Sequence, residues 1–159
     1  VYKNDVVYFH GAKKGKKIDF IKENAFASFS VVKDYSLIPS YFSSNSNLAC
    51  PATHFFKSII IDGQIEFVED YKEKVFVLQS LMGKLQSEGK YIPLNDKSMY
   101  EKMINATCVY KLVPSNIKGK IKLGQKLSTE RFNMVVEHLK QRDTKLDKLT
   151  LNEMLKNMS

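Results

Sequence analysis

The chain has 159 residues, of which 43% are apolar and 26% charged, and this composition is typical of a globular domain of moderate size. It excludes a disordered chain, a collagen-like repeat and a coiled coil. Twenty-five Lys and Arg residues against 17 Asp and Glu residues give a net charge of +8, which indicates anionic partners. Since Arg131 and Arg142 are the only arginines, the excess is lysine, a point charge that suits phosphate.

The cysteines and the apolar runs indicate the compartment. Cys50 and Cys108 are far apart and form no CxxC pair, which indicates a reducing environment and gives no reason to expect a zinc site. The longest strictly aliphatic run, Ile59–Ile61, is far shorter than the roughly 20 apolar residues that span a bilayer. Val1–His10 does not have the pattern of a signal peptide. We therefore expect a cytoplasmic protein without a membrane span.

The first predicted elements are a hairpin tip, a strand and a helix. Val1–Tyr2 runs directly into the turn cluster Lys3–Asp5, which predicts that most of a first strand is missing from the chain. Val6–His10 is β-branched and aromatic and predicts a strand with alternating faces. Gly11–Lys17 then predicts a basic loop, and Ile18–Asn24 a short helix.

The middle of the chain predicts strands on either side of a long loop. Ala25–Val32 returns to a strand pattern, whereas Asp34–Asn47 is rich in Ser, Asn and Tyr without a period and predicts a surface loop. Phe55–Val68 is the most β-like stretch. The Asp62–Gly63 pair within it allows either a tight hairpin or one long strand with a bulge.

Two helices are predicted next. Asp70, with Glu73 three residues later, predicts an N-cap, and apolar residues at helical spacing continue this helix up to Gly89. Asp96 predicts the cap of a second, short helix that runs through Asn105.

Two more strands complete the predicted sheet. Cys108–Val113 predicts a strand that Pro114 stops, and the alternation over Ile117–Leu123 predicts another, half-exposed strand. Strict alternation of strands and helices is absent, so a doubly wound parallel sheet is disfavoured. The sequence predicts an α+β protein, mainly β with helices, built on an antiparallel barrel.

The last part of the chain predicts a helical tail over residues 128–159. Ser128 leads into the first helical stretch, and Thr150 with Glu153 predicts a capping box for a last turn. There is no internal repeat and no composition shift that marks a boundary, so we expect a single domain over residues 1–159.

Lysines crowd the entry to the first predicted helix, at positions 13, 14, 16 and 17. Positive charge at a helix N-terminus costs about a few tenths of a kcal/mol per lysine unless an anion intervenes. A phosphate would resolve this conflict, and Gly11 and Gly15 would let the backbone approach it closely. A solvated basic loop in a lysine-rich protein explains the cluster equally well. Neither a GxxxxGK[ST] nor a GxGxxG motif is present.

The same stretch carries a resemblance to a known family. Tyr8–Ala12, with Gly15 and Lys17, resembles the YFHGA-x-x-G-x-K signature of the nitroimidazole-resistance (Nim) flavoproteins, which belong to the pyridoxamine 5'-phosphate oxidase-like split-barrel group. Lys57–Ile61 resembles the second signature of that family, where arginine is more usual than lysine at the first position. Ile117–Lys120 is similar to its late GK-containing strand. The resemblance extends to about Leu139, and its first signature is the most specific.

The resemblance implies a six-stranded split β-barrel, usually a homodimer, that binds FMN in grooves at the subunit interface. It also implies a helix and about one and a half strands before the position of Val1, so flavin binding would depend on a region that the chain does not show. By this likeness the candidate cofactor-binding residues are Tyr8, Phe9, His10, Lys13, Lys14, Lys17, Lys57 and Ser58.

The expected function is an FMN-binding oxidoreductase that reduces a small electron-poor substrate, with nitro compounds as the suggestion at the level of the family. FMN performs the redox chemistry itself, so no nucleophile or triad is required. His10 is the candidate catalytic residue, as a proton donor, although a histidine at the end of an apolar strand also serves as a structural hydrogen-bonding group.

Two alternatives stay open. A non-catalytic flavin or haem carrier or sensor on the same barrel would use His10 or His54 as a possible iron ligand. A nucleic-acid binder would explain the net charge of +8, but the low arginine content, the absence of tryptophan and the absence of an RNP-like motif disfavour it.

Overall fold

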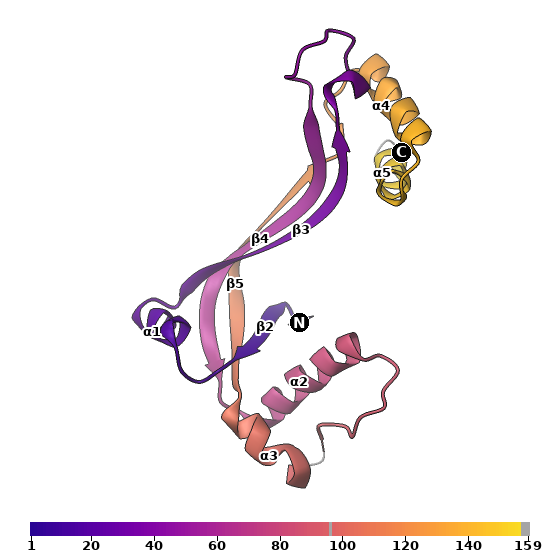
Figure 1. Cartoon of the computed structure of the whole chain (residues 1–159). Helices are drawn as coiled ribbons and strands as arrows, with labels where there is room; N and C mark the ends of the chain where they lie inside the picture. Colours follow the sequence, from indigo (N-terminus) through magenta and orange to yellow (C-terminus); the bar gives the residue numbers. More distant parts are fainter. Residues whose placement is uncertain (96, 157–159) are drawn as a thin grey trace. The chain divides into compact units, whose positions relative to one another are not determined.

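The computed structural model describes residues 1–95 and 97–156. Within them the strands are β1 (Tyr2–Lys3), β2 (Val6–Gly11), β3 (Phe26–Ile38), β4 (Thr53–Val68) and β5 (Cys108–Lys122). The helices are α1 (Lys16–Glu23), α2 (Tyr71–Leu85), α3 (Lys97–Ala106), α4 (Thr129–Arg142) and α5 (Lys145–Lys156), with a 3-10 turn at Ser40–Phe42. The strands form one sheet in the order β1-β2-β5-β4-β3 (Figure 1).

The α+β architecture with an antiparallel sheet is confirmed, since β1 pairs antiparallel with β2 and β2 with β5. The expected sixth strand is not found, because the described residues form five. The sequence-based expectations of further barrel elements before Val1 and of a single domain remain predictions. By its internal contacts the chain forms two compact units. The first unit comprises Val1–Phe29 and Ile61–Ile117, and the second comprises Ser30–Ile60 and the chain from Lys118 onward.

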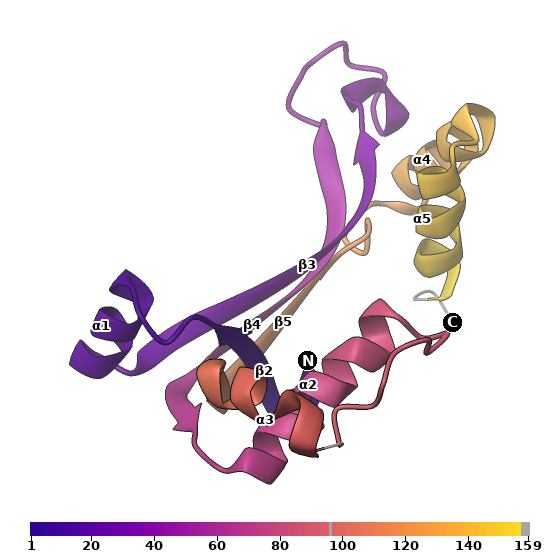
Figure 2. The same ribbon diagram turned by 60° about the horizontal axis from the view of Figure 1, so that its bottom comes forward.

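The first unit packs a helix against each face of β2. Alternation along the strand directs Tyr8 toward Val77 of α2, in a cluster that also holds Val68 and Val109. Phe9 points the other way, toward a cluster that includes residues of α1. Figures 1 and 2 show α1 and α2 on different sides of β2. The register aligns Phe9 with Tyr110 and His10 with Val109 of β5, so residues on the two strands share these faces.

Strand β4 confirms the long-strand alternative and excludes the hairpin at Asp62–Gly63. Gly63 allows β4 to pass close to β5. A Cβ built on this residue would lie 2.1 Å from the carbonyl oxygen of Val113, so no side chain fits there. The glycine therefore marks a backbone contact between strands and not a turn.

Two predicted strand ends are wrong. Strand β5 continues through Pro114, and the register with β2 ends at Leu112, so the missing N–H of the proline removes no bond of that ladder. Strand β3 continues to Ile38, so the loop predicted from Asp34 begins too early. Tyr35 and Ile38 are buried in the core of the second unit, and this long-range packing overrides the loop-like composition.

The predicted helices are present with shifted ends. Asp70 caps α2 as expected, since its carboxylate accepts a hydrogen bond from the backbone N–H of Glu73 at 2.7 Å, but the helix ends at Leu85 and not at Gly89. Helix α3 lies where the second short helix was predicted, and its predicted cap, Asp96, lies outside the described residues. None of the described helices combines the length and the apolar character needed to cross a membrane.

The helical tail is confirmed, but its predicted last cap is wrong. Ser128 caps α4 by accepting a hydrogen bond from the N–H of Arg131 at 3.4 Å. Thr150 lies inside α5, where its hydroxyl donates to the carbonyl of Leu146 at 2.8 Å and accepts from the N–H of Ser36 at 3.0 Å. A threonine that bonds across to β3 serves packing and not a helix start.

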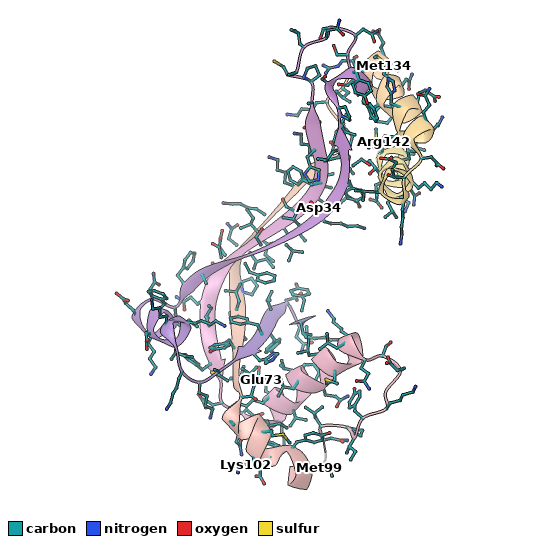
Figure 3. The ribbon with its side chains drawn as sticks, in the orientation of Figure 1. Asp34, Glu73, Met99, Lys102, Met134 and Arg142 are labelled. Atoms are coloured by element: carbon teal, nitrogen blue, oxygen red, sulfur yellow. The ribbon has the colours of Figure 1, made fainter. Side chains whose placement is uncertain are left out.

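A buried carboxylate holds the second unit together. Asp147 is fully buried at the start of α5 and accepts two bonds from Arg142, at 2.9 and 2.6 Å. It also accepts from the Ser36 hydroxyl at 2.5 Å and the Thr144 hydroxyl at 2.7 Å. The bonds from Arg142 and then those from the hydroxyl groups hold the pKa of Asp147 well below its usual range. Figure 3 labels Arg142 on α4.

Candidate functional site

The turn between β2 and α1 has the backbone that its glycines predicted. Gly15 occupies the N-cap position of α1 with φ of 118°, a conformation that other residues adopt with difficulty, and no side chain caps the helix there. A Cβ on Gly11 would lie 3.4 Å from the ammonium group of Lys17. The backbone N–H groups that open α1 therefore lack a side-chain cap from Gly15, as an anion site at this end would require.

The four lysines at the start of α1 do not converge on one site, because they lie at different cavities or at none. Lys13, Lys14, Lys16 and Lys17 are all exposed. The Lys17 ammonium lies 5.6 Å from the ring centroid of Tyr110, whereas Lys13 lines a separate pocket on the other side of α1. Lys14 and Lys16 line neither of these pockets. The structure thus divides the cluster that the sequence suggested.

Lys17 and Phe9 meet at one cavity, which we call the aromatic pocket. It has a volume of about 400 Å³ and is lined among others by Phe9, Lys17, Phe20, Asn24, Phe26 and Ile65. The ring of Phe9 stacks on that of Tyr110, with 4.8 Å between centroids and 16° between planes. Aromatic walls with one ammonium group suit a flat ligand that carries negative charge.

Tyr110, which the sequence analysis did not identify, holds Phe9 in position by ring stacking. It is fully buried, and its hydroxyl donates to the carbonyl of Ala12 at 3.2 Å. Burial and a hydrogen bond with Cys108 raise the pKa of Tyr110 to about 12, so the hydroxyl stays protonated. No local pattern could have shown this contact, because it depends on the register between β2 and β5.

Tyr8 and His10 lie on the other face of β2. The Tyr8 hydroxyl donates to the Glu73 carboxylate at 2.9 Å, and burial, followed by this bond, raises the pKa of Tyr8. Figure 3 labels Glu73 on α2, and the Lys111 ammonium lies 3.6 Å from the same carboxylate. His10 is exposed and lines a small cavity with Val77. The structure therefore does not bring His10 together with Lys17.

Lys57 and Ser58 belong to the second unit. The Lys57 ammonium forms an ion pair with Glu153 of α5 and lies 5.9 Å from the ring centroid of Tyr35. The hydrogen bond to Glu153 raises the pKa of Lys57. Ser58 follows on the opposite face of β4 and is half-buried. Lys57 is therefore already paired with a carboxylate of its own unit.

A larger cavity in the second unit contains none of the predicted site residues. It has a volume of about 510 Å³, with Ile38, Phe55 and Leu127 among its apolar lining residues. Size alone therefore does not select the functional site, and the aromatic pocket is the better candidate because it joins two of the predicted residues.

The comparison with known families bears on this choice. A family model described as pyridoxamine 5'-phosphate oxidase matches residues 1–121, a stretch that includes all eight candidate cofactor-binding residues. The chain belongs to this family. The family resemblance of the sequence is thereby confirmed, and the aromatic pocket lies entirely within the matched region.

Several solved structures have a fold similar to that of this chain. A candidate 5-nitroimidazole antibiotic resistance protein from Bacteroides thetaiotaomicron has a TM-score of 0.56 at 19% identity, over 74% of this chain and 62% of the other. A flavocytochrome from Azotobacter vinelandii has a TM-score of 0.59 at 21% identity, over 82% of this chain and 56% of the other. The FAD and haem binding protein of Mycobacterium smegmatis has a TM-score of 0.54 at 18% identity, over 76% and 55%.

These likenesses establish the split-barrel fold alone, because the identities are low. The chain spans less than two thirds of the length of each of these three proteins. No curated protein sequence matches it.

Proposed function

We propose that this protein is an FMN-binding oxidoreductase that reduces a small electron-poor substrate, such as a nitro compound. Membership of the pyridoxamine 5'-phosphate oxidase family supports this proposal. Three proteins of the same fold also support it: one is a flavocytochrome, one binds FAD and haem, and one is a candidate nitroimidazole resistance protein.

The observation that carries the proposal is the pairing of Phe9 and Lys17 at the aromatic pocket. Apolar aromatic walls suit a flat isoalloxazine ring, and the Lys17 ammonium suits the phosphate at the end of the ribityl chain of FMN. Bound FMN supplies the one- and two-electron chemistry. The chain's own contribution would be to hold the cofactor, with Phe9 stacked on Tyr110 and Lys17 positioned in the pocket lining by the first turn of α1.

We further propose that a second copy of the chain covers the exposed apolar side chains and completes the site. Phe20 and Phe26 line the aromatic pocket yet are 65% and 56% exposed, which is unusual for phenylalanine in a monomer. Exposed apolar residues also follow the long strands; they are Phe29, Val31, Val32, Ile59, Ile60, Val113, Ile117 and Ile121. A homodimer would bury such surfaces.

His10 is assigned the transfer of a proton to the reduced substrate. Its side chain is exposed but lies on the other face of β2 from the aromatic pocket, so this role requires a substrate that extends to that face. This role is tested by the pH profile of kcat. In His10→Gln, the part of the profile that depends on a proton donated by His10 should be absent. An unchanged profile would make His10 a structural residue.

The cofactor is tested by the visible spectrum of the purified protein and by mass spectrometry of the ligand released on denaturation. FMN is the expected ligand. Lys17→Gln should weaken FMN binding by about tenfold or more, since a charge-assisted bond to phosphate is lost. Lys16→Gln, a change on a neighbouring exposed lysine that lines neither pocket, should have little effect. Colourless protein that ignores added FMN would refute the proposal.

A second candidate function is a flavin or haem carrier, favoured by the two neighbours whose names include haem or cytochrome. A Soret band in the purified protein, with no turnover of reduced nicotinamide, would select it. The free thiols of Cys50 and Cys108 agree with the cytoplasmic location that we propose for either function.

A further inference from the structure

A second pocket of the first unit lies on the other side of α1 from Lys17. It has a volume of about 250 Å³, and its lining includes Lys13, Lys22, Glu69, Lys74 and Cys108. We call it the lysine pocket. Ile18 and Lys22 of α1 line it, whereas Lys17 and Ile21 line the aromatic pocket, so the two cavities use different faces of one helix.

Lys74 is the unusual member of this lining. Only 6% of the residue is exposed, and among residues 1–95 and 97–156 its ammonium group has neither a hydrogen bond nor an ion pair. Buried lysines are normally paired, because an ammonium group taken out of water without a partner is costly. The side chain therefore places its charge in the pocket while its alkyl stem packs in the interior.

The charges around this cavity do not balance. Lys13, Lys22 and Lys74 contribute three positive charges, and Glu69, which is exposed, is the single carboxylate in the lining. Like charges that share a partly enclosed space repel one another, and an anion with two charges would relieve that repulsion. Lysine is a point charge that suits phosphate, and no arginine fork for a planar carboxylate is present in this lining.

We propose that the lysine pocket binds a phosphate group, either as inorganic phosphate or as the phosphoryl end of a small molecule. The volume lies below the roughly 300–1,000 Å³ of pockets that enclose a whole drug-sized ligand, so the site takes an anionic group and not a complete cofactor. This cavity is separate from the aromatic pocket and shares no lining residue with it. It is defined by the buried Lys74 and not by the helix N-terminus.

The first experiment titrates inorganic phosphate into flavin-free protein and follows both the Tm and the NMR shifts of backbone amides. Phosphate should raise the Tm in a saturable way, and chloride at equal ionic strength should not. Lys74→Met preserves the length of the stem and should weaken phosphate binding by about tenfold or more. Lys72→Met, on an exposed position of the same helix, is the matched control and should bind phosphate as the wild type does.

A second variant protects the test against a failure to fold. Lys22 is exposed, so Lys22→Gln should fold normally and weaken phosphate binding by about threefold, because it removes one of the three positive charges. Phosphate binding that is equal in wild type, Lys74→Met and Lys22→Gln would overturn the proposal. So would a rise in Tm that chloride reproduces.

The source of the phosphate is resolved by comparing FMN with riboflavin. If the phosphate of FMN occupies the lysine pocket, Lys74→Met weakens FMN binding and leaves riboflavin binding unchanged. If the occupant is a separate phosphate, the variant loses phosphate binding and retains FMN binding. Because inorganic phosphate is titrated without flavin, failure of the lysine pocket is distinguishable from failure of the proposed flavin function.

Discussion

The two units differ in how the lysines beside their cavities and cores are paired, although both contain ion pairs, such as that of Lys111 with Glu73 in the first unit. In the second unit the buried carboxylate of Asp147 is paired with Arg142, and Lys57 is paired with Glu153. In the first unit the Lys17 ammonium lies over the ring of Tyr110, and buried Lys74 has no charged partner among the described residues. Paired charges hold a fold in one arrangement, whereas unpaired cations retain affinity for an anion. The comparison therefore agrees with the ligand sites that we propose for the first unit.

Removal of the buried Asp147 carboxylate should give the largest change in stability. It tests whether paired charges stabilise the second unit. Asp147→Ala leaves Arg142 and the hydroxyl of Ser36 without their acceptor, so we expect the free energy of unfolding to fall by about 3–5 kcal/mol. Chemical denaturation measures this loss. Glu137→Ala, which removes an exposed carboxylate paired with Lys140, should cost less than about 0.5 kcal/mol. Equal losses in the two variants would contradict the network.

Acid should weaken the same network. Because the pKa of Asp147 is lower in the folded chain than its ordinary value of 3.8, its contribution to stability is complete above that pH and is lost as the pH falls toward the folded value. The difference in unfolding free energy between wild type and Asp147→Asn should therefore shrink as the pH falls below 3.8. A difference that does not depend on pH would show that the carboxylate is not held ionised.

The first unit depends instead on close backbone packing, and two glycines test this. Gly63→Ala should destabilise the protein by about 1–2 kcal/mol, because its methyl group would overlap the carbonyl oxygen of Val113. Gly83→Ala, inside α2 with nothing within 4 Å of the added Cβ, should stabilise it by about 0.5–1 kcal/mol. Thermal unfolding distinguishes the two signs. A neutral Gly63→Ala would mean that β4 and β5 separate easily.

A variant of Lys74 tests whether the first unit retains a lysine without a charged partner. Lys74→Met should raise the unfolding free energy by up to about 1 kcal/mol in buffers without phosphate, since it replaces an ammonium group that lies among like charges in the lysine pocket with an apolar group on the same mostly buried side chain. Lys72→Met on the exposed face should leave stability unchanged. Added phosphate should cancel the advantage of Lys74→Met. A loss of stability in this variant would show that Lys74 has a structural partner.

Local patterns predicted the elements but not their ends or partners. The cap at Asp70 and the glycine turn at Gly15 were predictable because each depends on atoms a few residues away. The continuation of β3 was not predictable, since the stretch from Asp34 has a loop-like composition and the buried Ser36 finds its hydrogen-bond partners, Asp147 and Thr150, far along the chain. The sequence likewise could not show that Pro114 lies beyond the ladder with β2.

The candidate site was predictable in part for the same reason. The resemblance selected Phe9 and Lys17, which the structure joins at one pocket. It also selected His10, which strand alternation directs to the other face of β2, and Lys57, which α5 engages through Glu153. Lys74 was missed entirely, because a lysine within a helical pattern gives no sign of being buried.

Helix α1 contributes lining residues to both the aromatic pocket and the lysine pocket of the first unit. It has eight residues and is anchored by Ile18 and Ile21, and a helix of this length does not persist in water by itself. Local unfolding of α1 would therefore remove lining residues from both pockets at once. A ligand bound in either pocket should slow amide hydrogen exchange along the whole helix, so the two ligands would shift the same local unfolding equilibrium.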